Sequence, residues 1–247
     1  MGLSLPVMQL DAGELCQFYE TALGQAAQQL IAHHIRDVWP NTQGLRILGY
    51  GFATPYLSGV AAGSERVVAL MPARTGVIAW APGGRGLSVL SDEDALPFAD
   101  ALFDRILVVH GLEGADAARV LLRQLWRVLA PEGRMLLVTP NRASLWAQLE
   151  RSPFACGRPF HRSELAALLS DTLFEPVRWD SALYLPPFAG QRLARLGNGL
   201  ERLGRRVVPG LAGVHLVEVA KSLYGRAPVK GLPKAKAALR PAATLQG

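Results

Sequence analysis

Cysteine is scarce in this chain of 247 residues, which contains only Cys16 and Cys156. Two isolated thiols supply neither a disulfide framework nor the closely spaced ligands of a structural zinc site. This scarcity favours a reducing compartment, and we expect a cytoplasmic protein. The chain also has no uninterrupted apolar run of the roughly 20 residues that a membrane-spanning helix needs. Its first ten residues have no basic region of the secretory type, so we expect no signal peptide.

Lysine is absent from almost the whole chain, because all four lysines lie at or after Lys221. From Ala189 onward the sequence has eleven basic and two acidic residues, whereas the part before it has 15 basic and 18 acidic residues. The net charge of +6 therefore belongs to the C-terminal region, and the rest of the chain is slightly acidic.

Two common catalytic signatures are also missing. The chain has neither the Gly-x-Ser-x-Gly turn of serine hydrolases nor the lysine of a phosphate-binding loop. The adjacent residues His33 and His34 have no further ligand at helical spacing, so we expect no metal site there.

Apolar strands and amphipathic helices alternate through most of the chain. Near-continuous apolar strands indicate burial on both faces, and their alternation with helices predicts an α/β fold. We expect a doubly wound, mostly parallel seven-stranded sheet with helices on both faces. Strands are predicted at 45–50, 66–71, 87–90, 103–110, 134–139, 174–179 and 214–220, and helices at 15–38, 55–62, 115–129, 161–170 and 191–205.

The same patterns divide the chain into three parts. We expect an N-terminal helical segment at 1–43 and an α/β domain at 44–225, which carries a basic helical insertion at 183–212. Residues 226–247 are rich in Pro, Ala, Gly and Lys and show little periodicity, which predicts a disordered basic tail.

A turn of small residues follows the first predicted strand. Residues 46–57 read Arg-Ile-Leu-Gly-Tyr-Gly-Phe-Ala-Thr-Pro-Tyr-Leu, an apolar strand that enters a turn at the start of a helix. Small residues let a ligand approach the backbone N–H groups of such a turn. The pattern therefore indicates a loop for a nucleotide-type cofactor.

Two further segments make the interpretation more specific. Residues 91–98 read Ser-Asp-Glu-Asp-Ala-Leu-Pro-Phe, with Phe-Asp at 103–104, and residues 127–134 read Arg-Val-Leu-Ala-Pro-Glu-Gly-Arg. In this order and spacing, after the turn at 49–54, they resemble segments of class I S-adenosylmethionine-dependent methyltransferases. The resemblance extends over about 44–141 and implies a Rossmann-like methyltransferase fold with S-adenosylmethionine as cofactor.

The resemblance also implies a set of site residues. Asp92 matches the position that accepts from the adenine amino group, and His110 matches the wall nearest the transferred methyl group. His110 is the candidate base or substrate contact, with a purely structural histidine as the alternative. The substrate is expected to be a small or amphipathic molecule. The implied cofactor contacts are Gly49, Tyr50, Gly51, Ala53, Met71, Asp92, Glu93, Asp94, Ala95, Leu96 and His110.

Four positions of the loop and the second strand depart from that family, and one is Pro55, which stands where a third small residue is usual. Gly49 stands where the family has an acidic residue, Ala53 stands where it has a second glycine, and Met71 ends a strand that normally ends in a carboxylate. These departures support an alternative, a catalytically inactive methyltransferase-like protein that acts as a binding or regulatory partner.

The predicted basic helix at 191–205 allows three interpretations. Its leucines recur at helical spacing and arginines flank them. The helix can lie on the sheet or cap the site, or residues 189–206 can contact a membrane surface. Nucleic-acid binding is the least favoured, because no aromatic residues are interleaved with the basic ones.

Overall fold

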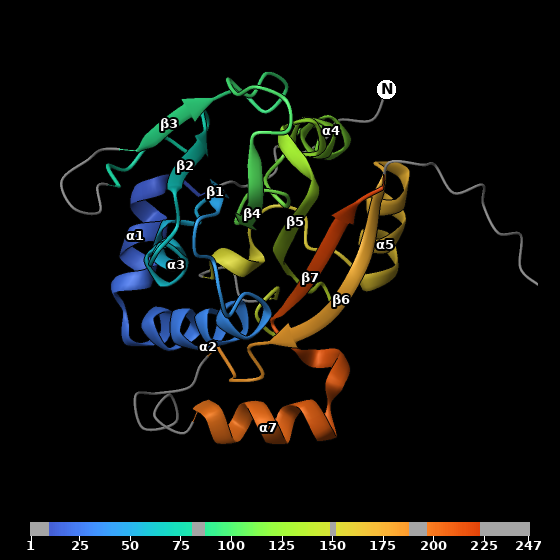
Figure 1. Cartoon of the computed structure of the whole chain (residues 1–247). Coiled ribbons are helices and arrows are strands. Elements are labelled where there is room, and N and C mark those ends of the chain that lie inside the picture. The colour runs from blue at the N-terminus through green and yellow to red at the C-terminus, as the bar shows by residue number, and fades with distance from the viewer. Residues whose placement is uncertain (1–9, 81–86, 149–151, 188–196, 223–247) are drawn as a thin grey trace, which may run out of the picture.

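The computed structural model describes residues 10–80, 87–148, 152–187 and 197–222. These residues form a seven-stranded sheet with helices on both faces, which confirms the predicted fold class (Figure 1). The helices are α1 (Ala12–Glu20), α2 (Ala22–Val38), α3 (Thr54–Val60), α4 (Ala118–Val128), α5 (Arg162–Asp171) and α7 (Gly197–Val207), with short 3-10 turns η2 (Pro153–Ala155) and η3 (Pro209–Leu211). The strands are β1 (Arg46–Gly51), β2 (Arg66–Pro72), β3 (Ser88–Ser91), β4 (Phe103–Val109), β5 (Leu129–Pro140), β6 (Phe174–Ala182) and β7 (Val214–Lys221).

The strand order is β3-β2-β1-β4-β5-β7-β6, and β7 runs antiparallel to both of its neighbours. The other strands are parallel where they pair. The carboxyl ends of β1, β2, β3, β4, β5 and β6 therefore share one edge of the sheet. Ligands of open parallel sheets bind at this edge, close to the point where the strand order reverses. Here that point lies between β1 and β4.

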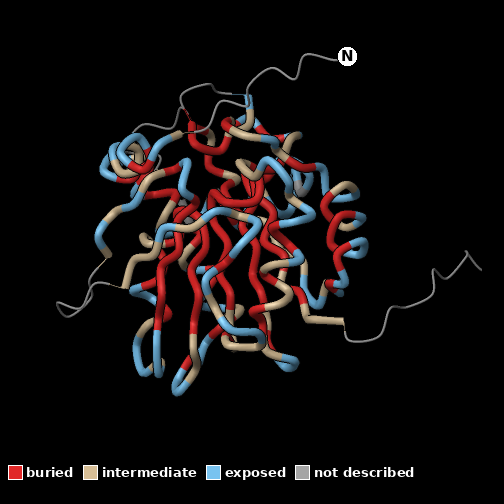
Figure 2. The backbone as a smooth tube through the Cα atoms, turned by 90° about the horizontal axis from the view of Figure 1, so that it is seen from above, coloured by how far each residue is buried: buried red, intermediate tan, exposed pale blue. Residues whose placement is uncertain are grey.

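Each face of the sheet has its own hydrophobic core, because alternate side chains of a strand point to opposite faces. In β1, Ile47 packs with residues of α1, α2 and α3, while Leu48 and Tyr50 pack with residues of α4 and α5. All three side chains are fully buried. Figure 2 shows that the buried backbone is concentrated in the strands and that exposed segments surround them.

The single helix predicted over 15–38 is two helices in the structure. The chain breaks at Thr21, whose backbone is extended and whose Oγ1 accepts from the N–H of Gly24 at 3.0 Å. A Cβ at Gly24 would collide with the carbonyl oxygen of Phe18, so glycine is needed for this sharp connection. Both helices pack into the core of one sheet face, so the N-terminal segment belongs to the same body as the sheet.

The insertion between β6 and β7 contains α7 and η3. The helix predicted at 191–205 overlaps α7, while residues 188–196 and the tail expected at 226–247 lie outside the described residues. Among the residues that are described, no helix is both long and apolar enough to cross a membrane.

Candidate functional site

The turn after β1 lies very close to the end of β4. Gly51 has φ +77°, and a Cβ there would collide with the carbonyl oxygen of Val109. The same oxygen accepts from the N–H of Phe52 at 2.7 Å. Only glycine allows both the backbone conformation and this close approach. The predicted loop is therefore a firmly held turn at the switch point of the sheet.

Gly49 shows why the acidic residue of the resembled family is missing here. A Cβ at Gly49 would lie 2.7 Å from Leu57 Cδ1 and 3.1 Å from Ala53 Cβ. Leu57 is fully buried on α3 and fills the space that an acidic side chain would enter. Leu57 therefore leaves no room for a side chain at Gly49.

Met71, near the end of β2, likewise offers no carboxylate. Its side chain is fully buried, and its Sδ accepts from the N–H of Ile78 at 3.3 Å. A ligand at this position would have only an apolar contact with Met71.

An acidic cleft lies at the carboxyl ends of β2 and β3. Its volume is about 280 Å³, a size near the lower end for small-molecule sites. Asp92 and Asp94 are exposed, Glu93 is half-buried, Ala95 is exposed and Leu96 is buried beneath the loop. The cleft is lined by Pro72, Ala73, Arg74, Asp92, Glu93, Asp94, Asp116, Ala117 and Val120.

Two polar atoms beside this cleft are buried without a hydrogen-bond partner. Glu93 accepts from the N–H of Asp116 through Oε1 at 3.1 Å, but its Oε2 has no partner. The hydroxyl of Tyr50 is the second such atom. Burial raises the pKa of Tyr50 above its usual value, and the nearby charge of Glu93 raises it further. Unsatisfied groups of this kind mark a place where a bound ligand or water completes the hydrogen bonding.

Arg74 and Asp116 form an ion pair on opposite sides of the cleft. Their side chains are 62% and 56% exposed. Exposed pairs of this kind contribute only about 0–1 kcal/mol, so a ligand can displace the pair at little cost.

His110 lies at the end of β4 with φ 48°, a left-handed conformation that is unusual for a residue other than glycine. Its Nδ1 lies 3.3 Å from Glu113 Oε1, and its Nε2 lies 2.8 Å from the hydroxyl of Tyr19. That hydroxyl also lies 2.9 Å from the hydroxyl of Tyr56. All four side chains are buried. Strained residues with such defined partners occur preferentially at functional sites.

The partners of His110 favour one assignment of the proton to its ring nitrogens. Burial raises the pKa of Tyr19 well above its usual value, and the electrostatic interaction and hydrogen bond with Tyr56 raise it further. The phenol is therefore neutral. With Glu113 as an acceptor, His110 Nδ1–H donates to Glu113 and Nε2 accepts from Tyr19. Tyr56 then donates to Tyr19. The result is a chain of four groups in which one carboxylate oxygen, Glu113 Oε2, has no partner.

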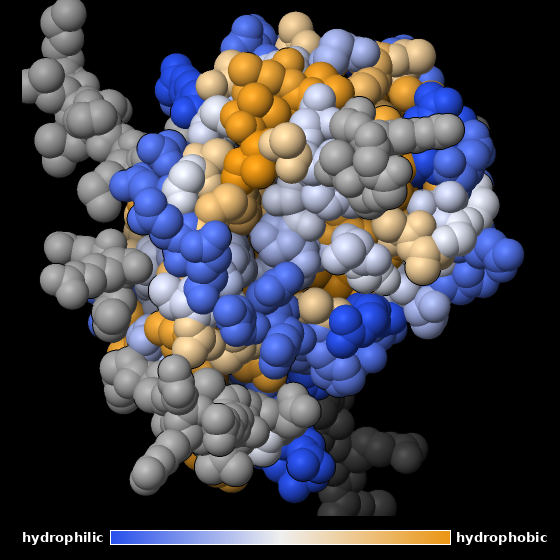
Figure 3. Space-filling model, turned by 90° about the vertical axis from the view of Figure 1, so that its left-hand side faces the viewer, coloured by the Kyte–Doolittle hydropathy of each residue, from blue (hydrophilic) through white to orange (hydrophobic). Residues whose placement is uncertain are grey.

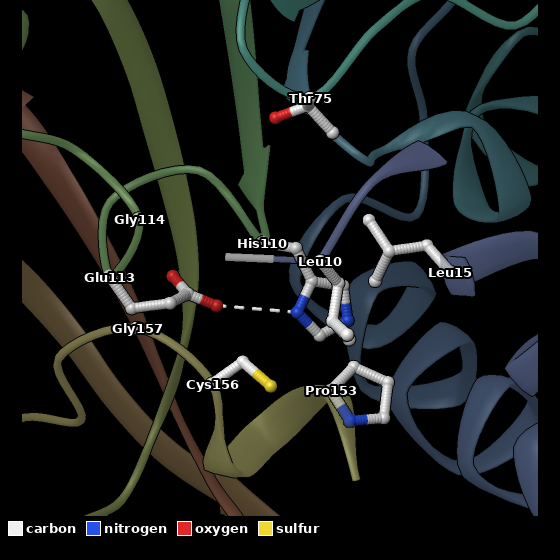
Figure 4. A pocket seen from close by; sticks show the side chains of 9 residues that line it. All are labelled: Leu10, Leu15, Thr75, His110, Glu113, Gly114, Pro153, Cys156 and Gly157. Carbon is white, nitrogen blue, oxygen red and sulfur yellow. Dashed lines mark hydrogen bonds and ion pairs between the residues drawn. The ribbon is translucent and has the colours of Figure 1, made fainter. Parts of the chain in front are cut away.

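A small pocket adjoins this network (Figure 4). In Figure 4, Glu113 and Cys156 lie on one side of His110, while Leu15 lies on the other. The pocket volume is about 20 Å³, which is room for a single water molecule. It is lined by Leu10, Leu15, Thr75, His110, Glu113, Gly114, Pro153, Cys156 and Gly157.

Helix α1 and the residues at its start cover one side of this pocket. The N–H of Ala12 donates to the carbonyl of Thr75 at 2.8 Å, Leu15 is 3% exposed, and Tyr19 reaches His110. The loops at 73–75 and 113–117 contribute to both the pocket and the acidic cleft, so the two spaces are neighbours.

The structure thus divides the residues predicted from sequence: His110 lines the small pocket and Ala95 is exposed, while the others fall into two groups. Asp92, Glu93 and Asp94 line the open cleft, while the turn at 49–53, Met71 and Leu96 are buried. Sequence reasoning missed Tyr19, Tyr56, Glu113 and Cys156. Only Glu113 left a signal in the sequence, an acidic residue three positions after His110.

His34, on α2, has a partner outside the candidate site, the Asp180 side chain of β6. Its Nδ1 lies 3.0 Å from Asp180 Oδ2. Burial alone would raise the pKa of Asp180, but hydrogen bonds from His34 and from the Ser181 N–H, with the charge of Arg205, lower it to about 2. Within the described ranges, no three His, Cys, Asp or Glu side chains are grouped so that they could hold a metal ion.

Comparison with known proteins agrees with this geometry. A family model described as a methyltransferase domain matches residues 48–137. A search of the curated proteins found no match. Among solved structures, a S-adenosylmethionine-dependent methyltransferase from Thermotoga maritima is 15% identical with a TM-score of 0.58, over 85% of this chain and 94% of that one.

Two further solved structures show how widely this fold is used. A S-adenosylmethionine-dependent methyltransferase from Mesorhizobium loti is 17% identical with a TM-score of 0.53, over 83% of this chain and all of that one. The [4+2]-cyclase SpnF is also 17% identical with a TM-score of 0.56, over 90% of this chain and 87% of that one. The segment 48–137 therefore matches the methyltransferase-domain family, and the chain shares the fold of these solved methyltransferases.

Proposed function

We propose that this protein is a S-adenosylmethionine-dependent methyltransferase that acts on a small or amphipathic molecule. The observation that carries the proposal is the acidic cleft beside the buried pair of His110 and Glu113. The cleft supplies acceptors for a nucleoside, and the pair supplies a group that can take a proton. Both lie at the carboxyl edge of the sheet, where α/β folds bind such ligands.

The described residues fit the adenosine end of the cofactor. Asp92 is exposed at the end of β3, where its carboxylate can accept from the adenine amino group. Glu93 Oε2 and the hydroxyl of Tyr50 lack partners and would gain them from bound polar groups. These atoms supply polar contacts that Gly49 and Met71 do not.

The methionine end has matching chemistry but little room. Glu113 Oε2 is a buried carboxylate oxygen without a partner, suited to accept from the cofactor's amino group. The space beside it, however, holds only one water molecule. Leu15 and Tyr19 must therefore move with α1 to admit the ligand. When bound, S-adenosylmethionine supplies an electrophilic methyl group.

His110 is the candidate general base. A substrate hydroxyl or amine that takes the place of the Tyr19 hydroxyl would meet the lone pair on Nε2. Glu113 holds the opposite nitrogen and would stabilise the ring after it accepts a proton. Positioning of the reactants can supply much of the remaining rate enhancement.

Isothermal titration with S-adenosylmethionine and S-adenosylhomocysteine tests the proposal. We expect saturable binding in roughly the micromolar range, weakened about tenfold in Asp92→Ala. Glu132→Ala is the matched control, because Glu132 is an exposed carboxylate near the amino end of β5, at the edge of the sheet opposite the cleft. Equal affinities for the two variants would refute the assigned cleft.

A second candidate function is a binding or regulatory protein without catalysis. The replacement of both expected carboxylates by Gly49 and Met71, together with the small pocket at His110, favours it. This candidate predicts neither heat on titration nor a thermal shift with either ligand. Binding that depends on Asp92 would exclude it.

A further inference from the structure

Helix α7 packs on the rest of the protein through a polar and small face. Glu201 is 6% exposed, and its Oε1 accepts from the N–H of Tyr184 at 2.6 Å. Gly204 lies against the Tyr184 ring, where a Cβ would be 2.7 Å from Cγ. Arg205 Nη2 lies 3.5 Å from Asp180 Oδ1. The inward side of α7 therefore depends on hydrogen bonds, close backbone approach and charge.

Four apolar side chains of α7 and the segment after it are exposed. Leu203 is 59% and Val207 67% exposed, followed by Val208 at 39% and Leu211 at 49%. In the part of the chain that the structure describes, four of the ten exposed large hydrophobic side chains fall within these nine positions. In Figure 1, α7 lies at the outer limit of the molecule, beyond α2. We call these four residues the outer apolar surface.

An ordinary surface helix buries its apolar side chains, whereas α7 buries Glu201 and exposes Leu203 and Val207. The inward contacts of α7 are made by Glu201 and Gly204, on the side away from the outer apolar surface. A concentrated exposed apolar surface usually marks an interaction site.

The charges around the outer apolar surface indicate what it contacts. Arg202 and Arg206 are exposed one helical turn apart, each next to an apolar residue of the surface. Between residues 197 and 211, Glu201 is the single acidic residue, and it is buried on the inward face. Arg202 and Arg206 also line a cleft that they share with Asp37 of α2. Apolar side chains flanked by arginines, with no exposed carboxylate between residues 197 and 211, match the interface of a bilayer that contains anionic phospholipids.

The insertion also lies beside the candidate site. It begins after β6, whose carboxyl end is on the same edge of the sheet as those of β1 and β4. The carbonyl of Leu185 accepts from Trp146 Nε1 at 2.7 Å, Trp146 contacts Phe154, and Phe154 contacts His110, with ring centroids 5.3 Å and 5.0 Å apart. Packed side chains thus connect the start of the insertion, at Leu185, to the candidate general base, His110.

We propose that α7 and η3 dock on the surface of a bilayer containing anionic phospholipids through the outer apolar surface and its flanking arginines. Docking in this way brings the carboxyl edge of the sheet near the lipid, which suits an amphipathic substrate taken from the membrane. The docking stands on the geometry of α7 and η3 alone, and the choice of an amphipathic substrate rests on the proposed function.

Co-sedimentation of the full chain with vesicles tests the docking, with no cofactor added. We expect binding to vesicles of phosphatidylcholine mixed with phosphatidylglycerol, and weak binding to phosphatidylcholine alone. The double variant Leu203→Ser/Val207→Ser and the variant Arg206→Glu should each weaken binding by about tenfold or more. The matched control is Val177→Ser, because Val177 is 53% exposed on β6, outside the insertion.

Far-UV circular dichroism and thermal unfolding check that the variants are folded. Equal sedimentation of the control and the insertion variants, or no sedimentation of the wild type with anionic vesicles, would overturn the docking. A dimer in light scattering that Leu203→Ser/Val207→Ser abolishes, without vesicle binding, would also overturn it and assign the surface to a second copy. Titration with S-adenosylmethionine in the same preparation reports separately on the proposed function.

Discussion

The contact between Gly49 and Leu57 allows a quantitative test of whether Leu57 excludes a side chain at Gly49. Gly49 is buried, and the position of its absent Cβ lies 2.7 Å and 2.8 Å from the two Cδ atoms of Leu57. Such separations are far shorter than the roughly 3.5–4.0 Å of a favourable carbon contact. We therefore expect Gly49→Ala to force Leu57 to move.

The expected cost of each single change follows from packing. Gly49→Ala adds one methyl group to a filled space, which should destabilise the protein by about 1–3 kcal/mol. Leu57→Ala removes a fully buried side chain and should cost about 2–5 kcal/mol. In the double variant, the new methyl group occupies part of the cavity and no longer collides with Leu57. The double variant should therefore be more stable than the sum of the singles predicts, by about 1–2 kcal/mol.

Urea unfolding followed by tryptophan fluorescence measures these free energies. The double-mutant cycle gives the coupling directly, provided that the slope of the transition is unchanged among the variants. A coupling free energy below about 0.5 kcal/mol would refute the reasoning, since independent sites usually add within that margin. Leu57 would then not be the group that excludes a side chain at Gly49.

Three further predictions concern other parts of the fold. Tyr19→Phe should destabilise the protein by about 1–3 kcal/mol in thermal or urea unfolding, because it leaves His110 Nε2 and the Tyr56 hydroxyl buried without their partner; an unchanged midpoint would contradict the network. Gly51→Ala should reduce the yield of folded protein more than Gly49→Ala does, because φ +77° disfavours any side chain and the obstacle is backbone; circular dichroism of both variants compares them. Burial lowers the pKa of His215 from its usual 6.5 to about 4, so between those pH values the unfolded chain binds a proton that the folded one does not, and stability should fall by up to about 3 kcal/mol as the pH drops through this window. His215→Phe should flatten this part of the stability profile, and identical pH dependence of the two proteins would show that His215 does not titrate as described.

Local patterns were enough to predict the sheet and the loops at its carboxyl edge. Strands such as β4 are apolar without interruption, which indicated burial on both faces, and β4 is indeed a central strand. The glycine turn and the acidic loop at 91–98 were visible because each depends on a few adjacent residues. The break at Thr21 was missed, since the apolar spacing continues through it and only the cap geometry ends α1.

The candidate site was only partly predictable, because its polar network joins distant parts of the chain. Tyr19 and His110 meet 91 positions apart, and no periodicity in either segment indicates that contact. The cofactor contacts proposed at the turn and the acidic loop stay predictions until binding is measured.

By itself, the sequence determined the class of fold, the loops that follow the strands and the absence of carboxylates at Gly49 and Met71, because each follows from the order and type of neighbouring residues. Only the tertiary structure decided that Leu57 fills the space at Gly49, that α1 closes the pocket at His110 and that α7 exposes Leu203 and Val207. An amphipathic pattern shows that a helix has two unlike faces. Which face is buried depends on the surface against which the helix packs, here Tyr184 and Asp180.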